Sequence, residues 1–221
     1  MNWDWQFTYD VVWPKMLAAV PVTIQATVYS FLIAVVLGLV LMLLRTSRIR
    51  LIAWPVGELI EFIRATPLLV QIFFLFFVLP EFGIVLPPLT TGILAIGIYN
   101  GALCSEVYRA GLQAVPKGQW EAATALNLST YRTFRDIIIP QSLPPIVPAL
   151  GNYLILIFKE TPLLSFVAVA EIMQASKLIG HEYYRFTEAV TMAGIFFLVL
   201  SLAAAFLVNV VERYLKRSVL H

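Results

Sequence analysis

The stretch MLAAVPVTIQATVYSFLIAVVLGLVLMLL, residues 16–44, holds no charged side chain and lies between Lys15 and Arg45. A helix needs about 20 predominantly apolar residues to cross roughly 30 Å of hydrocarbon, because each residue advances it by about 1.5 Å. This run is longer than that minimum. It therefore predicts a membrane-spanning helix.

The rest of the chain repeats this pattern. Of its 221 residues, 60% are hydrophobic and 13% are charged, whereas soluble domains carry about 25% charged residues. Further uncharged runs cover residues 82–105, 137–158 and 189–211, and a shorter run, 65–80, extends backward through apolar residues to Leu59. We predict an all-α integral membrane protein with five transmembrane helices. The apolar piece 161–170 is too short to span, so we expect a half-helix or a re-entrant segment there.

The basic residues predict the orientation, because cytoplasmic loops carry an excess of lysine and arginine. With the N-terminus outside, the inner segments hold Arg45, Arg48, Arg50, Arg109, Lys117, Arg132, Arg135, Arg213, Lys216 and Arg217. The outer segments then hold only Lys15, Lys159, Lys177 and Arg185. This asymmetry predicts an N-out/C-in topology, which agrees with an odd number of spans.

The segment between the third and fourth predicted spans, residues 112–140, carries the most specific signal. The alanine-rich run 119–126 favours a short helix, and Asn127 tolerates the left-handed conformation that ends one. Ser129 suits the N-cap of a second helix, and Pro140 is expected to end that helix. We therefore predict a helix–turn–helix on the cytoplasmic face.

This segment resembles the permease family of ATP-binding-cassette (ABC) importers. The family signature is Glu-Ala-Ala, three residues, Gly, nine residues and Ile-x-Leu-Pro. The matching residues here are Glu121, Ala122, Ala123, Asn127, Ile137, Ile139 and Pro140. Two positions depart from the signature: Asn127 replaces glycine, and Ile139 replaces leucine. The alternative interpretation is an ordinary amphipathic connector on the membrane surface, which would not need this spacing.

The resemblance implies that residues 1–221 form one permease domain of the type I importer fold, in the bacterial cytoplasmic (inner) membrane. It also implies that residues 112–140 are a coupling loop, with the ATPase contacted by Glu121, Ala122, Ala123, Leu126 and Asn127. The implied partners are a dimer of ABC ATPases, a second permease chain as homodimer or heterodimer, and an extracytoplasmic solute-binding protein. ATP and Mg would bind to the ATPase, with no cofactor, metal or nucleic acid bound by this chain.

A second motif is similar to the polar amino-acid branch of that family, whose solutes include histidine, glutamine, arginine and opines. Residues 62–74 read Phe-Ile-Arg-Ala-Thr-Pro-Leu-Leu-Val-Gln-Ile-Phe-Phe, with Ala65 where the branch has glycine. Pro67 is expected to kink or start a helix. The resemblance implies import of polar amino acids or of derivatives such as ectoine, without selecting one solute.

Polar groups within the apolar runs are candidates for the solute pathway, because charge is costly at bilayer depth. These are Asn100, Glu106, Asn152, Glu160 and Thr161. Pro162 should free the carbonyl of Phe158, and a broken helix offers backbone groups to a zwitterion. Glu160 would meet an ammonium or amidinium group, and Thr161 a carboxylate.

Structural alternatives stay open for the same residues. Glu160 would be ordinary at the outer interface, together with Lys159. Asn100 and Asn152 would serve equally as interhelical hydrogen-bonding groups. Glu106 stands three residues before Arg109, so the two side chains would form an ion pair near the inner face.

The chain lacks the residues of the common catalytic motifs. It has no Gly-x4-Gly-Lys-Ser/Thr loop, which ATP binding in a P-loop requires, and no Gly-x-Ser-x-Gly elbow. We therefore predict a transport subunit and not an enzyme. The alternative function is a stand-alone secondary amino-acid transporter, but such proteins often contain internal repeats and paired broken helices. No repeat is evident here.

Overall fold

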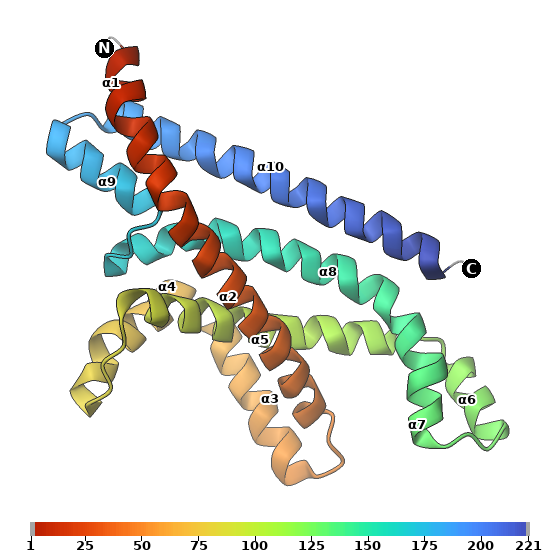
Figure 1. The fold of residues 1–221 in the computed structure, drawn as a ribbon. Helices are drawn as coiled ribbons and strands as arrows, with labels where there is room; N and C mark the ends of the chain where they lie inside the picture. Colours follow the sequence, from red (N-terminus) through yellow and green to blue (C-terminus); the bar gives the residue numbers. More distant parts are fainter. Residues whose placement is uncertain (1–2, 220–221) are drawn as a thin grey trace.

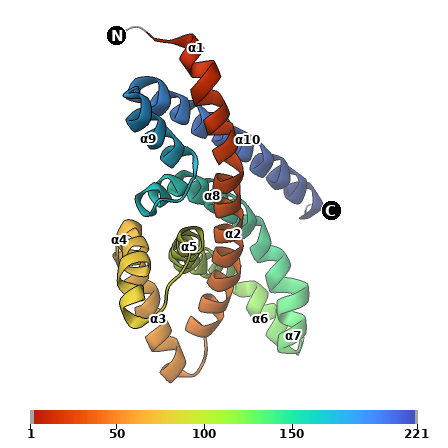
Figure 2. The ribbon, with the colours of Figure 1, turned by 60° about the vertical axis from the view of Figure 1, so that its left-hand side comes forward.

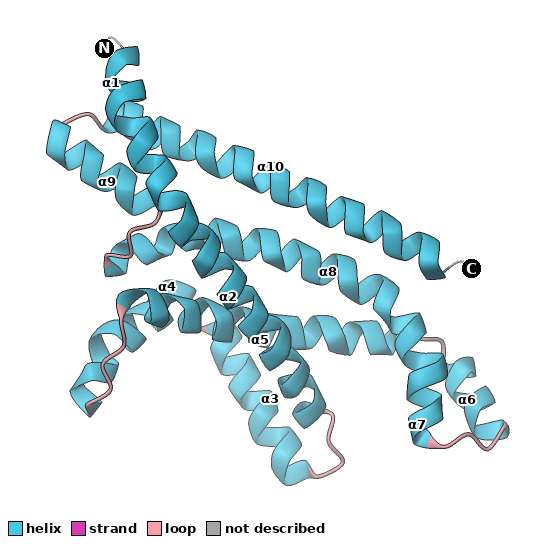
Figure 3. Ribbon diagram, viewed as in Figure 1, coloured by secondary structure: helices cyan, strands magenta, loops and turns pink. Residues whose placement is uncertain are grey.

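The computed structural model describes residues 3–219, and over these residues the fold consists of helices joined by loops, with no strand (Figures 1 and 3). The helices are α1 (Trp5–Phe7), α2 (Trp13–Arg45), α3 (Arg50–Ala65), α4 (Leu68–Phe73), α5 (Pro88–Gln113), α6 (Lys117–Ala125), α7 (Thr130–Arg132), α8 (Ile139–Glu160), α9 (Ile172–Tyr183) and α10 (Phe186–Val219). Short π-helical segments cover Thr8–Val12, Phe74–Val78 and Thr133–Ile138, and 3-10 segments cover Leu79–Phe82 and Thr161–Val167. The prediction of an all-α protein is confirmed.

Three helical stretches in the described part of the chain are long and apolar enough to cross a membrane: Trp5–Arg45, Thr130–Val167 and Phe186–Val210. A bent pair, Arg50–Ala65 with Leu68–Phe82, makes a fourth if it is counted as one span. α5 is less apolar, because glycines, threonines and Asn100 lie along it, but its 26 residues extend for about 39 Å. The five predicted spans therefore correspond to α2, the bent pair, α5, α8 and α10.

The second predicted span is not a continuous helix. Its two halves, α3 and α4, meet at an angle of 103°. Thr66 is extended and Pro67 follows it at the N-cap of α4, because a residue before proline is driven out of the helical region. Gln71 holds the bend together, since its side-chain amide donates to the carbonyls of Ile63 (2.8 Å) and Thr66 (3.1 Å).

α5 is the central helix of the fold, and its closest neighbour is α2. Figure 2 shows α5 end-on, with α2, α3, α4 and α8 around it. Small residues make this contact: every fourth residue of α2 from 26 to 38 is alanine, serine or glycine, and all of them are buried. Gly97 and Gly101 of α5 face them, so the two backbones approach closely, as in small-xxx-small pairs of membrane helices. Ser30 also donates a hydrogen bond to the carbonyl of Ile93 (3.2 Å).

The helix that ends in α8 is longer than expected. Ser129 caps its start, as predicted, by accepting the N–H of Arg132 at 3.4 Å. Pro140 does not end it, and that prediction was wrong. Residues 130–160 are helical without interruption, because the π-helical segment Thr133–Ile138 just before the proline adjusts the backbone to the missing N–H.

The two ends of the molecule agree with the predicted sidedness. The α2–α3 and α6–α7 loops lie toward one end, and the N-terminus and the α9–α10 loop toward the other (Figures 1 and 2). Lys159 is an exception, because it lies in the last turn of α8 and not in an outer loop. The number of basic residues assigned to the outer segments therefore falls from four to three. The side chains of Lys216 and Arg217 lie outside the described part of the chain.

The end that carries the N-terminus contains a helix that the sequence analysis missed. α9 follows the 3-10 segment Thr161–Val167, which confirms the short helical piece expected there. Ion pairs tie this end together: Lys15 with Glu182 (2.6 Å) and Arg185 with Asp4 (2.9 Å). The hydrogen bond from Lys15 lowers the pKa of Glu182 below its ordinary value.

The α2–α5 contact predicts a specific sensitivity at Gly38. A Cβ atom at this position would come within 2.7 Å of the Cys104 Cβ and 2.9 Å of the Gly101 carbonyl oxygen. We expect Gly38→Ala to destabilise the protein by about 1–3 kcal/mol, as overpacking does, and to lower the melting temperature measured by tryptophan fluorescence in detergent.

The matched control is Gly194→Ala in α10, where an added Cβ meets nothing within 4 Å. That change should leave the melting temperature unchanged or raise it, because alanine favours helix. Equal melting temperatures for the two variants would contradict the close-approach account.

Candidate functional site

Two of the predicted pathway residues meet at the middle of α5. Asn100 is the central residue of that helix and is completely buried. Its amide nitrogen donates to the Glu160 carboxylate (2.7 Å) and to the carbonyl of Ile96 (3.0 Å). Glu160 therefore lies about 20 Å from either end of α5, and the interpretation of Glu160 as an outer interfacial residue was wrong.

The Asn100–Glu160 pair keeps unused acceptor capacity. The carbonyl oxygen of the Asn100 side chain is buried and has no hydrogen-bond partner among the described residues. A carboxylate accepts about four hydrogen bonds, and Asn100 is the only donor recorded for the Glu160 side chain in the described part of the chain. An orphan acceptor and an ionisable acid so close together form a site for a donor, above all for a cationic one.

Thr161 is not available to a solute, contrary to the prediction. It is completely buried, and its hydroxyl donates to the carbonyl of Phe158 at 2.8 Å. The backbone N–H of Thr161 points to the same carbonyl. Pro162 does remove one hydrogen bond from Phe158, as expected, but Thr161 replaces it.

Asn152 does not join the pair either. It is exposed on the surface of α8, and with Lys159 it lines a hollow between α8 and α10. The alternative interpretation of Asn152 as an interhelical hydrogen-bonding residue has no support within the described residues, whereas for Asn100 the same interpretation is confirmed.

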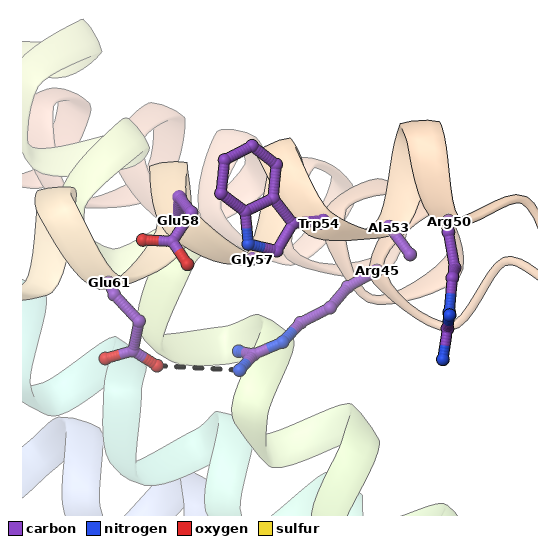
Figure 4. A pocket seen from close by; sticks show the side chains of 7 residues that line it. All are labelled: Arg45, Arg50, Ala53, Trp54, Gly57, Glu58 and Glu61. Atoms are coloured by element: carbon purple, nitrogen blue, oxygen red, sulfur yellow. Dashed lines mark ion pairs between the residues drawn. The ribbon is translucent and has the colours of Figure 1, made fainter.

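Glu106 belongs to a separate ion-pair cluster, which joins α2, α3 and α5 near the α2–α3 loop. Its carboxylate contacts Arg45, Arg64 (3.8 Å) and Arg109, whose Nε lies 2.9 Å away. The predicted pair of Glu106 with Arg109 is thus confirmed. Glu61 adds a further contact to Arg45 at 3.5 Å (Figure 4). Each partly exposed ion pair contributes little to the free energy of unfolding. The role of the cluster is therefore mainly geometric, since it links α3 to α2 and α5.

A hollow of about 600 Å³ opens beside this cluster (Figure 4). Arg45 and Arg50 line it on one side and Glu58 and Glu61 on the other, with Trp54 between them. Arginine and tryptophan are typical of the membrane–water interface. We assign this hollow to the membrane surface and not to the solute pathway.

The predicted coupling loop has the local structure that its residues favour. α6 covers Lys117–Ala125, close to the predicted 119–126. Asn127 adopts the left-handed conformation with φ of 51°. Ala123 is buried, whereas Glu121, Ala122, Leu126 and Asn127 are exposed. Trp120 packs edge-on against Phe134 at 5.5 Å, which holds α6 against the helix that follows.

The exposed side of α6 includes an unusual apolar side chain. Leu126 is 72% exposed at the end of this helix, and Tyr131 is 69% exposed in the next one. Both side chains are therefore accessible to another protein. No group of His, Cys, Asp or Glu side chains suited to a metal ion occurs among the residues described.

Comparison with known proteins places these features in a family. Residues 34–217 match the model of the binding-protein-dependent transport system inner membrane component. A probable amino-acid ABC transporter permease protein, y4tG, of Sinorhizobium fredii (strain NBRC 101917 / NGR234) is 47% identical over 211 residues, which cover 96% of this chain and 91% of the relative. The arginine transport system permease protein ArtQ of Bacillus subtilis (strain 168) is 32% identical over 217 residues, with 98% and 99% covered.

A solved structure shows the same arrangement of helices. It is described as the crystal structure of an amino acid ABC transporter with histidines, and it matches with a TM-score of 0.92 at 33% identity. The match covers 97% of this chain and 100% of that one. These relatives are transport subunits and not enzymes, and they displace the alternative of a stand-alone secondary transporter. The chain belongs to the binding-protein-dependent inner membrane components, as the multi-pass permease subunit of an ABC importer for amino acids.

Proposed function

We propose that this permease imports polar amino acids or amino-acid derivatives, and that Glu160 and Asn100 contact the cationic group of the solute inside the membrane domain. The observation that carries this proposal is the orphan carbonyl oxygen of Asn100 beside the Glu160 carboxylate. A solute ammonium group has three donors. It can therefore satisfy both acceptors and neutralise the acid at once.

The position of Glu160 supports a functional role. Glu160 ends α8 and lies beside the middle residue of α5, and an acid at mid-depth of a membrane costs about 2.5–3.5 kcal/mol on insertion scales. Asn100 offsets part of that cost with one hydrogen bond, but a cation would offset more. An ionisable group kept at this depth is by default a candidate for the transport pathway.

The range of solutes follows from the chemistry of the pair. Relatives are named for arginine, nopaline, glutamine and L-cystine, and each of these solutes carries nitrogen donors. Ectoine is a cyclic amino-acid derivative with an amidinium group, so the same two acceptors suit it. It therefore belongs in the panel of solutes to be tested.

We also propose that residues 112–140 dock an ABC ATPase dimer, which binds ATP and Mg, while the whole chain 1–221 serves as one permease domain. The exposed residues Glu121, Ala122, Leu126 and Asn127 would contact the ATPase, and the buried Ala123 would support them. A second permease chain would complete the pathway, and an extracytoplasmic binding protein would deliver the solute.

The continuous helix from Thr130 to Glu160 offers a mechanical link between the two sites. One end starts directly after the coupling loop, and the other end carries the acid that faces Asn100. ATP-driven movement of the loop would therefore displace Glu160 relative to α5. This would change the geometry of the solute site between the two states of the transporter.

The first test replaces the acid with its neutral isostere. Glu160→Gln keeps an acceptor for Asn100 but removes the charge, and a charge-assisted hydrogen bond contributes about 1.5–3 kcal/mol. We expect uptake of radiolabelled L-arginine and L-glutamine by cells to fall about 10- to 100-fold, at equal permease levels in the membrane. Glu81→Gln, which changes an exposed acid in the 3-10 segment Leu79–Phe82, should transport normally. Unchanged uptake by Glu160→Gln would rule out the proposed contact.

The second test addresses the coupling loop. Glu121→Lys reverses an exposed charge on α6, so it should abolish co-purification of the ATPase and uptake, while the membrane level and melting temperature stay the same. Glu81→Lys makes the same charge reversal in the 3-10 segment Leu79–Phe82 and should retain the ATPase. If both variants retain it equally, the docking role of Glu121 is wrong.

A further inference from the structure

The face of α3 that borders the hollow beside Arg45 carries charged and aromatic residues at helical spacing. Arg50, Trp54 and Glu58 stand four residues apart, so their side chains follow one another along one side of the helix. All three line the hollow of about 600 Å³ together with Arg45 of α2 (Figure 4). Gly57 also lines it and adds no side chain, and a Cβ atom there would meet only the Arg45 Nε, at 3.8 Å. The hollow is therefore open between the end of α2 and this face of α3.

Two charged groups in the hollow have no partner within the described residues. No hydrogen bond or ion pair involves the side chain of Arg50 or that of Glu58. Arg45 does contact Glu61 and Glu106, but a guanidinium group has five N–H donors, so it keeps capacity for a further acceptor. The hollow thus offers N–H donors toward one end and an unpaired carboxylate toward the other.

The surface around the hollow is suited to contact with lipid. Leu43 and Leu44, which end the uncharged run of α2, are exposed, and Leu51 in the first turn of α3 is 86% exposed. Trp54 is 71% exposed, and tryptophan is enriched at the depth of lipid headgroups. The α2–α3 loop lies at the end of the molecule that the basic residues assign to the cytoplasm. A lipid of the inner leaflet would therefore find apolar surface for its acyl chains beside the hollow.

We propose that this hollow binds the headgroup of an inner-leaflet lipid of the phosphatidylethanolamine class. The phosphate lies between Arg45 and Arg50, because guanidinium groups form charge-assisted hydrogen bonds with phosphate oxygens. The ammonium group lies between Trp54 and Glu58, since it is attracted both by a carboxylate and by the face of a tryptophan ring. The two charges of this headgroup are joined by a two-carbon spacer, and the groups along α3 complement them in the same order. The inference does not depend on which solute is carried.

The acids of the hollow select against other occupants. Glu58 and Glu61 line it alongside Arg45 and Arg50, so its two positive charges are matched by two negative ones. Sites for anionic lipids gather basic residues, and an unpaired carboxylate beside a phosphate would repel it. The cores of protein–protein interfaces are depleted of charged residues, which disfavours a partner subunit here. The ammonium of the zwitterionic headgroup makes the Glu58 carboxylate a binding group.

The first arm of the test measures which lipid headgroup the whole transporter prefers. Native mass spectrometry of the transporter, purified with its native partners, is used to titrate it with phosphatidylethanolamine and with phosphatidylglycerol of the same acyl chains. Phosphatidylglycerol has the phosphate but no ammonium group. We expect phosphatidylethanolamine to bind about fivefold more tightly, the factor that one charge contributes near a membrane surface. Equal binding of the two lipids, or tighter binding of phosphatidylglycerol, would overturn the proposal.

The second arm assigns the two charges of the headgroup to opposite ends of the hollow. Glu58→Gln should weaken binding of phosphatidylethanolamine about fivefold and leave that of phosphatidylglycerol no weaker, whereas Arg50→Gln should weaken binding of both lipids about fivefold. The matched control is Arg48→Gln, which removes an exposed arginine of the same loop that is not part of the lining. It should change neither affinity. Equal losses for Arg48→Gln and Arg50→Gln would show a general surface attraction, and the assigned site would be wrong.

The third arm tests the other sources of an occupant. Glycerophosphoethanolamine has the same charges without acyl chains, and we expect it not to displace the lipid at equal concentration. Displacement would mean that the hollow takes a soluble ligand and not a lipid. Cys104 is the only cysteine of the chain and is buried, so Trp54→Cys can be examined in a Cys104→Ala background. Disulfide crosslinking of that cysteine to single cysteines in the ATPase or the second permease chain should fail, and efficient crosslinking would show that protein covers the hollow.

Discussion

The close approach of α2 and α5 is the constraint on which the rest of the membrane domain depends. Lipid gives helices no hydrophobic reason to associate, so packing of small residues must supply the attraction. Gly38 lies against Cys104 with no room for a Cβ, and Gly97 lies equally close to Ile33. This contact sets the rotation of α5 about its axis. Asn100, about 100° from the adjacent Gly101, is consequently directed toward Glu160 and not toward α2.

The long helix Thr130–Glu160 is the second feature that positions the Asn100–Glu160 pair. It tolerates Pro140 next to the π-helical segment Thr133–Ile138 and further prolines within α8, because freed carbonyls inside a bundle can be satisfied locally. Thr161 does this at the far end, where its hydroxyl reaches the carbonyl of Phe158. The helix therefore stays continuous over its apolar length, and then breaks where a charge must face inward. The helix therefore connects Ser129 directly to the Asn100–Glu160 pair.

The features predictable from sequence were the local ones. Uncharged runs identify spans because length and polarity suffice, and Asn127 was recognised because its left-handed conformation is a property of the residue type. The position of a side chain along the membrane normal, and its partners from other helices, were not predictable. Glu106 meets Arg45 from another helix, and Lys159 was counted as an outer residue because an interrupted apolar run resembles a membrane boundary. The stripe of small residues at 26–38 was readable in principle, since its spacing of four is visible in the sequence.

The position of the consecutive residues Lys159 and Glu160 along α5 follows from where their helix begins. The helix starts at Thr130, outside the apolar run 137–158, so part of its length is used before it enters the hydrocarbon. Its remaining residues reach only as far as the centre of α5, where Pro162 and the 3-10 segment interrupt it. A helix that began at the membrane surface would carry the same two charges to the opposite interface, where water would screen them. The position at which this helix begins therefore determines where along α5 the two charges lie, and charges away from water interact more strongly with other charges.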